Sequence, residues 1–206
     1  MTYQEHMKQV MLNKKRYIEL LMSTKRTGMS ELIDHLEKNR FFTSPASAQY
    51  HNAFDGGLCD HSLKVLDILV AKCEQLVPGK YSESTMIVTA LLHDICKAGK
   101  YINGQRWRKD AHNKWESYPG YSYADEVVHL GHGSKSVYIA RTFIELTATE
   151  AMGIFWHMGL TTTPNTYDFS NAAAECPLAV LMHTADIESS YVMESRGIVE
   201  DKVSQK

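Results

Sequence analysis

The sequence predicts an all-α fold with one small non-helical insertion at residues 101–126. Apolar side chains recur at helical spacing through most of the 206-residue chain, and such a period indicates amphipathic helices. Residues 101–126 lose this period and become aromatic and polar. A chain of this length fits one domain, which we expect to span 1–206, with helices of 1–40 packed on a core of about 41–195.

Charge and composition exclude several classes of protein. The net charge is −2, from 22 basic and 24 acidic side chains, which argues against a nucleic-acid or membrane binder driven by bulk charge. No apolar run is long enough to cross a membrane, and the first residues do not resemble a signal peptide. The four cysteines are widely spaced without a C-x-x-C motif, so we expect reduced thiols and a cytoplasmic protein.

Four helices are predicted in the first half of the chain. Their expected ranges are 3–23, 30–39, 60–76 and 84–98. The first is amphipathic, with apolar anchors that include Met11, Tyr17 and Met22. Ser30 is the expected N-cap of the second helix, and residues 42–57 are rich in turn formers.

Three more helices are predicted in the second half, at 134–146, 147–157 and 177–191. Ser134 is the expected N-cap of the first of them, Thr147 and Glu150 form a possible capping box for the second, and Pro177 suits the start of the third. A polar loop is expected from 161 to 173. The insertion at 101–126 carries Arg-Trp-Arg and Lys-Trp-Glu segments and is predicted to form a β-hairpin or a lid.

Histidine is unusually frequent in this chain, with ten copies among 206 residues. His93 and Asp94 are adjacent in an otherwise apolar segment, where burying them is costly unless both are satisfied. A lone pair of this kind is ordinarily hydrogen-bonded or solvent-facing. Four further polar residues, however, sit at predicted helix ends or in apolar helices. These are His61, His132, His157 and Asp186.

Three or four imidazoles with two carboxylates suit one or two divalent metal ions. Imidazole-rich ligation favours Mn, Fe, Ni, Co or Zn over Ca, which prefers oxygen ligands, and Mg stays among the candidates. The sequence therefore predicts a metal centre built from these six residues.

These motifs resemble the HD-domain metal-dependent phosphohydrolases, from about Phe41 to Tyr191. The segment GGLCDHSL at 56–63 is similar to the family's GGL-x-x-HS-L, and LLHDICK at 91–97 to its LLHD-x-x-K core, with Cys96 in place of the commoner glycine. His132 and His157 resemble the extra histidines of binuclear members, and Asp186 the closing acidic ligand. The lead-in FFTSPASAQYH resembles a branch of small bacterial and phage HD proteins.

The resemblance implies an HD-fold hydrolase whose ligands divide between two metals. One ion would be held by His61, His93, Asp94 and Asp186, and the second by His132 and His157 with Asp94 bridging. A metal-bound hydroxide would then attack phosphorus, so Asp94 is the first catalytic candidate. The expected substrate is a nucleotide, dinucleotide or short oligonucleotide phosphate ester, and short single-stranded nucleic acid is a further candidate partner.

Four residues are candidates for binding substrate. Lys97 lies one helical turn after Asp94, and family members use this lysine near the substrate phosphate; the alternative is a lysine that complements the helix dipole. His51 could bind substrate or cap its loop. Arg106 and Arg108 could grip phosphate beside stacked bases, or form a solvated face of a hairpin.

Other readings stay open at this point. The same fold and ligand set also supports di-iron oxygenases, and a non-catalytic HD module that binds a nucleotide is a third possibility. Among the remaining histidines, His183 and His129 are ambiguous between lining the site and a structural role. The other three, His6, His35 and His112, are expected at the surface.

Overall fold

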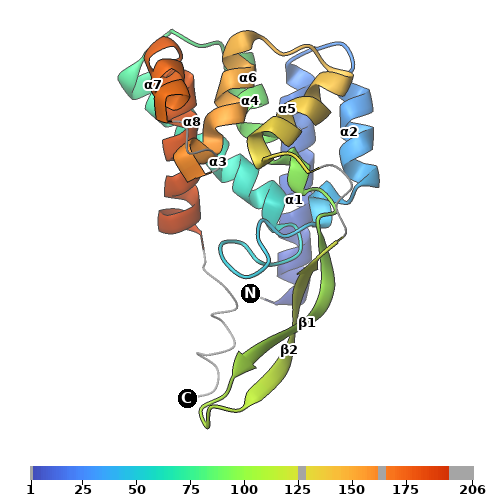
Figure 1. Cartoon of the computed structure of the whole chain (residues 1–206). Helices are drawn as coiled ribbons and strands as arrows, with labels where there is room; N and C mark the ends of the chain where they lie inside the picture. Colours follow the sequence, from blue (N-terminus) through green and yellow to red (C-terminus); the bar gives the residue numbers. More distant parts are fainter. Residues whose placement is uncertain (1, 125–128, 162–165, 195–206) are drawn as a thin grey trace.

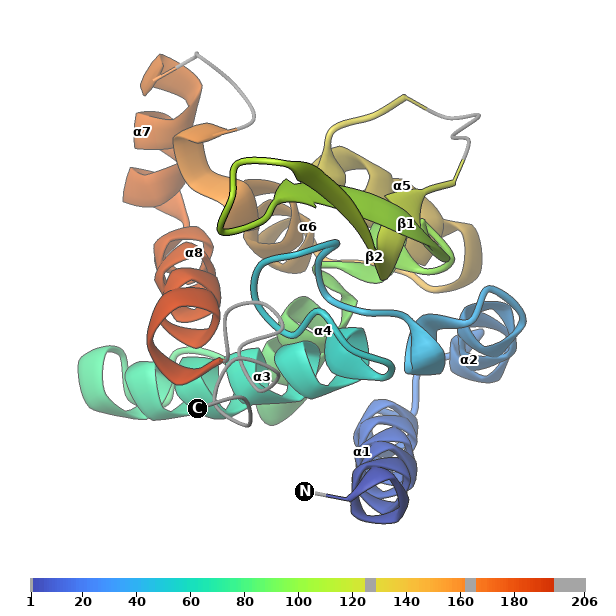
Figure 2. The same ribbon diagram turned by 90° about the horizontal axis from the view of Figure 1, so that it is seen from below.

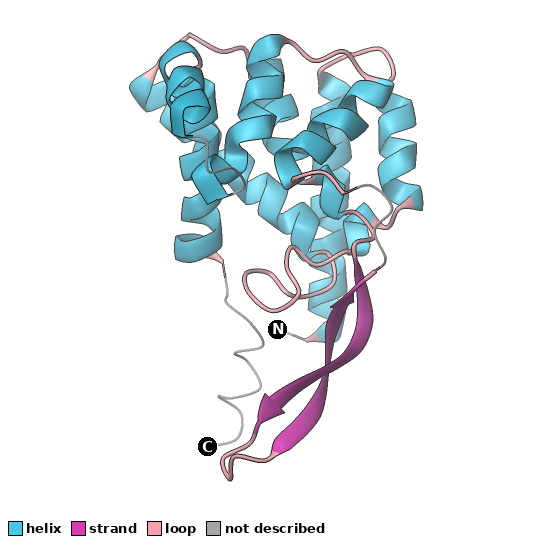
Figure 3. Ribbon diagram, in the orientation of Figure 1, coloured by secondary structure: helices cyan, strands magenta, loops and turns pink. Residues whose placement is uncertain are grey.

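A computed structural model describes residues 2–124, 129–161 and 166–194. In these ranges the chain forms eight α-helices and one two-stranded antiparallel sheet. The helices gather into one body and the two strands extend away from it (Figures 1 and 3). The predicted helical fold with a hairpin insertion is therefore confirmed.

Two helices open the chain, α1 (Tyr3–Ser23) and α2 (Met29–Lys38). Thr2 and Glu5 form a capping box at the start of α1. Tyr17 is fully buried, and its hydroxyl donates to the carbonyl of Leu91 at 2.5 Å. Met11 and Met22 were expected in the core but are exposed, because α1 buries only a narrow stripe. The N-cap of α2 is residue 28 rather than Ser30.

The centre of the body is built by α3 (Gly57–Leu76), α4 (Glu83–Leu92) and α8 (Pro177–Glu188). α3 packs against both α4 and α8, as the view in Figure 2 shows. α4 is buried on nearly all sides. The helix predicted to reach residue 98 ends at Leu92, and a separate 3-10 turn follows at Ile95–Lys97.

Three further helices complete the body, α5 (His132–Phe143), α6 (Ala148–Phe155) and α7 (Thr166–Glu175). The capping box of Thr147 and Glu150 is present at the start of α6. α5 begins at His132, so Ser134 lies inside the helix and is not its N-cap. A polar loop was predicted at 161–173. This prediction was wrong from residue 166 onward, where the chain forms α7. A 3-10 segment, Trp156–Thr161, follows α6.

The insertion is a hairpin of β1 (Tyr101–Lys109) and β2 (Trp115–Tyr123). Its register pairs Tyr101 with Tyr123 and Lys109 with Trp115. Asp110 closes the turn, since its Oδ1 accepts the backbone N–H groups of residues 112 and 114. The hairpin projects below the helical body in Figure 1.

The chain leaves α8 through a π-helical turn, Ser189–Met193. The predicted last helix to residue 191 therefore ends earlier, at Glu188. Among the helices that the structure describes, none combines the length and the apolar character that a membrane crossing requires.

Candidate metal centre

The structure brings the six predicted metal-binding side chains together around Asp94. They come from different elements, since α3, the end of α4, the start of α5, the 3-10 segment after α6, and α8 each contribute. Their order in the chain is His61, His93, Asp94, His132, His157 and Asp186. Ligand atoms of His61, His93 and Asp94 lie within 4.8 Å of one another, as do those of His93, His157 and Asp186. His132 lies within the same distance of Asp94, in a group that also includes Cys96.

The turn before α3 places His61. Residue 56 has a φ of +82°, and a Cβ at residue 57 would lie 2.1 Å from the carbonyl oxygen of Asn52. Both positions therefore require glycine. This close approach lets α3 begin directly beneath the 44–56 loop, and the buried ring of His61 in its second turn faces the centre of the bundle.

The rings of His93 and His157 are each held by the same kind of hydrogen bond to the backbone. Each follows the end of a helix, and each ring places Nδ1 2.7 Å from the backbone carbonyl three residues earlier, of Ala90 and Ile154 respectively. A ring nitrogen facing a carbonyl carries the proton. Nε2 of both rings is therefore left with its lone pair, and both rings are fully buried.

His132 reaches the centre because α5 starts against the end of α6. A Cβ at residue 133 would lie 2.0 Å from the carbonyl oxygen of Phe155, so only glycine allows this approach. Nδ1 of His132 is buried and lacks a hydrogen-bond partner among the described residues. Its Nε2 lies 3.4 Å from Nζ of Lys100.

Asp94 is the hub of the cluster. Its Oδ2 lies 3.4 Å from Nε2 of His93 and 3.7 Å from Nε2 of His61, and its Oδ1 lies 3.5 Å from Nε2 of His157. Lys97 Nζ is 2.6 Å from Oδ2. Burial opposes ionisation of Asp94, but Lys97, His93 and His157 together outweigh it, and the pKa of this carboxyl lies well below its ordinary value.

Glu194 joins the site although the sequence did not single it out. This buried carboxylate accepts a hydrogen bond from Nδ1 of His61 at 2.7 Å and another from the hydroxyl of Ser189. On the other side of the ring, Nε2 of His61 lies 3.2 Å from Oδ1 of Asp186. Glu194 lies beyond the last helical period, in a short turn, so no sequence pattern pointed to it.

Burial and the carboxylates set the charge of the imidazoles. Burial lowers the pKa of His93, and it lowers those of His132 and His51 to about 4. His157 and His61 behave differently. Burial opposes the charge of His157, but Asp94 outweighs it and raises the pKa of this ring. Glu194 and Asp186 outweigh the burial of His61 and raise its pKa to about 10. Without a cation, a proton on His61 therefore balances the carboxylates.

The donor set fits divalent metal. Nε2 of His61 and Nε2 of His93 lie 3.2 Å apart, and among the described residues Oδ1 of Asp94 and Nε2 of His157 are buried without a hydrogen-bond partner. Lone pairs that face one another and a carboxylate at such distances repel unless a proton or a metal cation lies between them. Nitrogen and oxygen donors in this mixture suit transition-metal ions.

A cavity of about 650 Å³ opens onto this centre. Lys97, His51, Tyr101 and His183 line it together with three members of the cluster, His132, His157 and Asp186, and with residues of the 44–56 loop and α8. Nδ1 of His183 lies 2.7 Å from the carbonyl oxygen of His157, so the ring braces the segment that carries a predicted ligand.

The structure does not bring Arg106 and Arg108 to the cavity. Arg106 donates to the side chain of Gln49 and to the carbonyl of Tyr121, and Arg108 donates to Glu116 across the hairpin. His129, His35 and His112 also lie outside the cavity lining, and His6 packs on the ring of Phe54.

The sequence of the chain is similar to a known protein over part of its length. A curated phosphodiesterase is similar to part of this chain. It is the dihydroneopterin 2′,3′-cyclic phosphate phosphodiesterase of Methanocaldococcus jannaschii, 32% identical over 94 residues. The match covers 43% of this chain and 36% of the relative, so the chain matches about a third of that protein. No family model matches the sequence. No solved structure matches it.

Proposed function

We propose that this protein is a metal-dependent phosphohydrolase of the HD-domain superfamily that acts on a nucleotide-like phosphate ester. The observation that carries the proposal is the convergence of three imidazole Nε2 atoms on the Asp94 carboxylate, with His132 and Asp186 beside them. The partial similarity to a cyclic phosphate phosphodiesterase supports the same chemistry.

The ligands divide into two sets around Asp94. His61, His93, Asp94 and Asp186 would hold one divalent ion, and His132 and His157 would hold a second that shares Asp94. Bound there, divalent ions would lower the pKa of a coordinated water and offset negative charge on the phosphoryl oxygens. The protein's own contribution is to aim Nε2 of His61, His93 and His157 at the centre through the partners at Nδ1, which are Glu194 and the carbonyls of Ala90 and Ile154.

Lys97 would hold the substrate phosphate at the cavity side of the centre. Its ammonium is buried, and although burial opposes this charge, Asp94 raises the pKa of Lys97 above its ordinary value. A permanent cation beside the carboxylate hub can bind one phosphoryl oxygen while it remains bonded to Asp94. His51, neutral and lining the same cavity, can donate or accept a hydrogen bond at the ester oxygen.

The phosphodiesterase relative favours hydrolysis over the oxygenase alternative. That relative is a 2′,3′-cyclic phosphate phosphodiesterase, and Lys97 supplies the phosphate-binding cation that such a substrate needs. Cyclic 2′,3′-phosphates of nucleosides are therefore the first substrates to assay, followed by nucleoside monophosphates.

Two substitutions test the proposal, Asp94→Ala and Lys97→Ala. Loss of Asp94 removes the carboxylate that both ions share, so we expect bound metal to disappear and turnover to fall by more than about 100-fold. Lys97→Ala should keep its metal but raise KM. The measurements are metal content by mass spectrometry and hydrolysis of bis-p-nitrophenyl phosphate and 2′,3′-cyclic nucleotides.

Asp67→Ala is the matched control, because Asp67 is an exposed carboxylate of α3 that pairs with Arg16. It should keep both metal and activity. Full activity in Asp94→Ala, or metal-independent activity in the unaltered protein, would contradict the proposed function.

A further inference from the structure

Aromatic side chains line one face of the hairpin. Successive strand residues alternate between faces, so the register puts the odd-numbered residues of β1 and β2 on a common face. Near the tip, Trp107 and Trp115 are 64% and 65% exposed on this face. At the base, Tyr101 packs on Tyr123, with ring centroids 5.4 Å apart. Tyr101 also lines the cavity of the metal centre.

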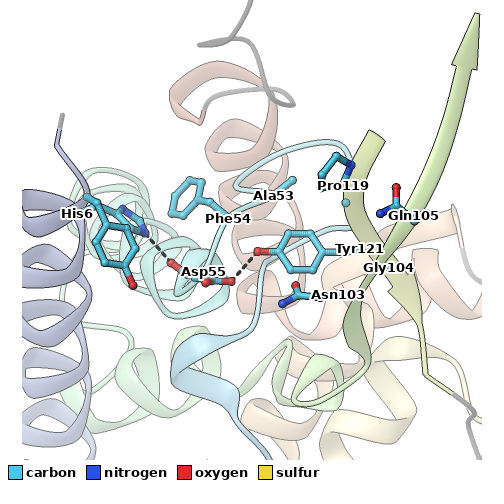
Figure 4. Close-up of a pocket in the computed structure, with 11 residues that line it drawn as sticks. His6, Ala53, Phe54, Asp55, Asn103, Gly104, Gln105, Pro119 and Tyr121 are labelled. Atoms are coloured by element: carbon cyan, nitrogen blue, oxygen red, sulfur yellow. Dashed lines mark hydrogen bonds between the residues drawn. The ribbon is translucent and has the colours of Figure 1, made fainter. Parts of the chain in front are cut away.

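Between the tip and the base of the hairpin, the same face lines a groove. This groove has a volume of about 750 Å³ and lies between the start of α1, the 44–56 loop and the hairpin. Figure 4 shows Tyr121 and Asn103 turned into it opposite His6 and Phe54. The hydroxyl of Tyr121 donates to the carboxylate of Asp55 at 2.6 Å, so the acidic side chain of the groove is already hydrogen-bonded within the protein. Amide and aromatic side chains therefore line a space large enough for a nucleobase.

Positive charge is concentrated on the hairpin although the chain is slightly acidic. Residues 101–123 carry four cationic side chains and two acidic ones, whereas the whole chain has 22 and 24. Arg106, Arg108 and Glu116 belong to the opposite face by the same alternation, so Lys109 is the charged side chain that the two strands place on the aromatic face. Lys109 Nζ lies 5.7 Å from the ring centre of Trp115, and Lys100 Nζ lies 5.9 Å from that of Tyr123. Cations beside exposed aromatic faces suit a ligand that alternates bases with phosphates.

We propose that this hairpin face binds single-stranded nucleic acid, with bases stacked on Trp107 and Trp115 and the strand directed toward the metal centre. The proposal rests on the proposed function for the reaction itself, and it assigns the substrate class as an oligonucleotide. Lys109 and Lys100 lie beside the rings, and the strand residues of this face include no carboxylate, which favours a polyanion over a peptide. The exposed rings favour unpaired bases over a duplex. Tyr101 connects the stacking face to the cavity where the phosphate would be cleaved.

Fluorescence anisotropy of labelled oligo(dT) of about ten nucleotides, with EDTA present to prevent cleavage, tests this binding. We expect Trp107→Ala/Trp115→Ala to weaken binding by at least about tenfold, and Lys109→Ala to reduce its salt dependence. Tyr138→Ala is the matched control, because Tyr138 is an equally exposed aromatic residue on α5. It should bind like the unaltered protein.

A second measurement does not depend on the variants. Trp156 is buried, so the exposed tryptophans of the chain are the two on the hairpin. Oligo(dT) should therefore quench much of the intrinsic fluorescence of the unaltered protein, and Trp107→Phe/Trp115→Phe should abolish this quenching.

Hydrolysis of bis-p-nitrophenyl phosphate separates this inference from the proposed function. Hydrolysis retained in the double variant, with oligonucleotide binding lost, supports both. Binding without any hydrolysis would refute the proposed function but keep the nucleic-acid surface. The inference is overturned if the double variant binds oligo(dT) like the unaltered protein, if neither measurement detects binding, or if the substitutions change only self-association in analytical ultracentrifugation.

Discussion

At the scale of single residues, Glu194 decides which nitrogen of His61 is free. Its carboxylate accepts a hydrogen bond from Nδ1 at 2.7 Å, so Nε2, which faces Asp94 and Asp186, is the nitrogen that gives up its proton to bind metal. Carboxylates that hold a ligating imidazole in this way raise its basicity and fix its orientation. The residue is thus a positioning residue for the metal centre.

Glu194→Gln should lower the affinity for divalent metal by about 10- to 100-fold. The amide can still accept from Nδ1, but it removes the negative charge that strengthens His61 as a ligand. Isothermal titration with Mn²⁺ or Zn²⁺ measures the change. Glu188→Gln is the control, since Glu188 is the last residue of α8 and pairs with Lys72 away from His61. Equal affinities in the two variants would contradict the role of Glu194.

Metal affinity should also rise with pH, because a proton competes for His61. In the metal-free protein Glu194 and Asp186 outweigh burial and raise the pKa of His61 to about 10. Binding through Nε2 requires loss of this proton, so affinity should increase up to about pH 10, by at most about tenfold per pH unit. Titrations between about pH 6 and about pH 8 in buffers of different ionisation enthalpy count the released protons. A pH-independent affinity would exclude this competition.

The sequence identified the residues whose chemistry stands out from their surroundings. Polar groups in apolar segments are costly to bury, and this cost distinguished His93, Asp94 and Asp186 in the sequence. The structure brings all six predicted ligands together. That they hold metal stays a prediction. Glu194 could not be found in this way, because its carboxylate belongs to an irregular turn. The place of Arg106 was equally unpredictable, since its partner Gln49 lies 57 positions away.

At the scale of elements, an ion pair ties the loop after α1 to the start of α6. Arg26 makes two hydrogen bonds to Glu150, at 2.9 and 2.5 Å, and the carboxylate is fully buried. Burial opposes ionisation of Glu150, but Arg26 and the Thr147 amide hold its pKa below the ordinary value. α6 leads directly to His157, so this pair anchors an element of the metal centre.

Arg26→Ala should reduce the free energy of unfolding by about 3 kcal/mol, because it leaves a buried carboxylate without its counter-ion. Urea denaturation measures the loss. Arg16→Ala breaks the exposed pair with Asp67 and should cost less than about 1 kcal/mol. Similar losses in both variants would show that burial of Glu150 does not determine the effect.

The predicted helices were wrong where local hydrogen bonds or small buried surfaces outweigh the apolar period of the sequence. The helix predicted from 84 to 98 stops at Leu92, where the His93 ring bonds to the Ala90 carbonyl. α7 was missed because it buries little apolar surface; Ala172 is its one buried residue among those described. Long amphipathic helices such as α1 and α3 were predicted well, since their apolar stripes are continuous.

At the scale of the whole molecule, the candidate ligands join elements that are far apart in the sequence. α3, α8 and the segments after α4 and α6 each supply at least one donor. Bound metal would therefore bridge the bundle, and its binding energy would add to the energy of folding.

Saturating metal should raise the stability of the protein. At a free concentration of about 100 times Kd, one site contributes about 2.7 kcal/mol, which corresponds to a rise in Tm of about 5–10 °C. Differential scanning calorimetry with and without EDTA measures this shift, and Asp94→Ala should show none. A shift retained in that variant would place the metal elsewhere.

The separation of the donors along the chain has a consequence for folding kinetics. His61 and Asp186 lie 125 positions apart, and contacts between such distant segments form late, after the loop between them has closed. An ion that needs both side chains would then find no complete site in the transition state. Divalent metal would slow unfolding and leave the refolding rate unchanged.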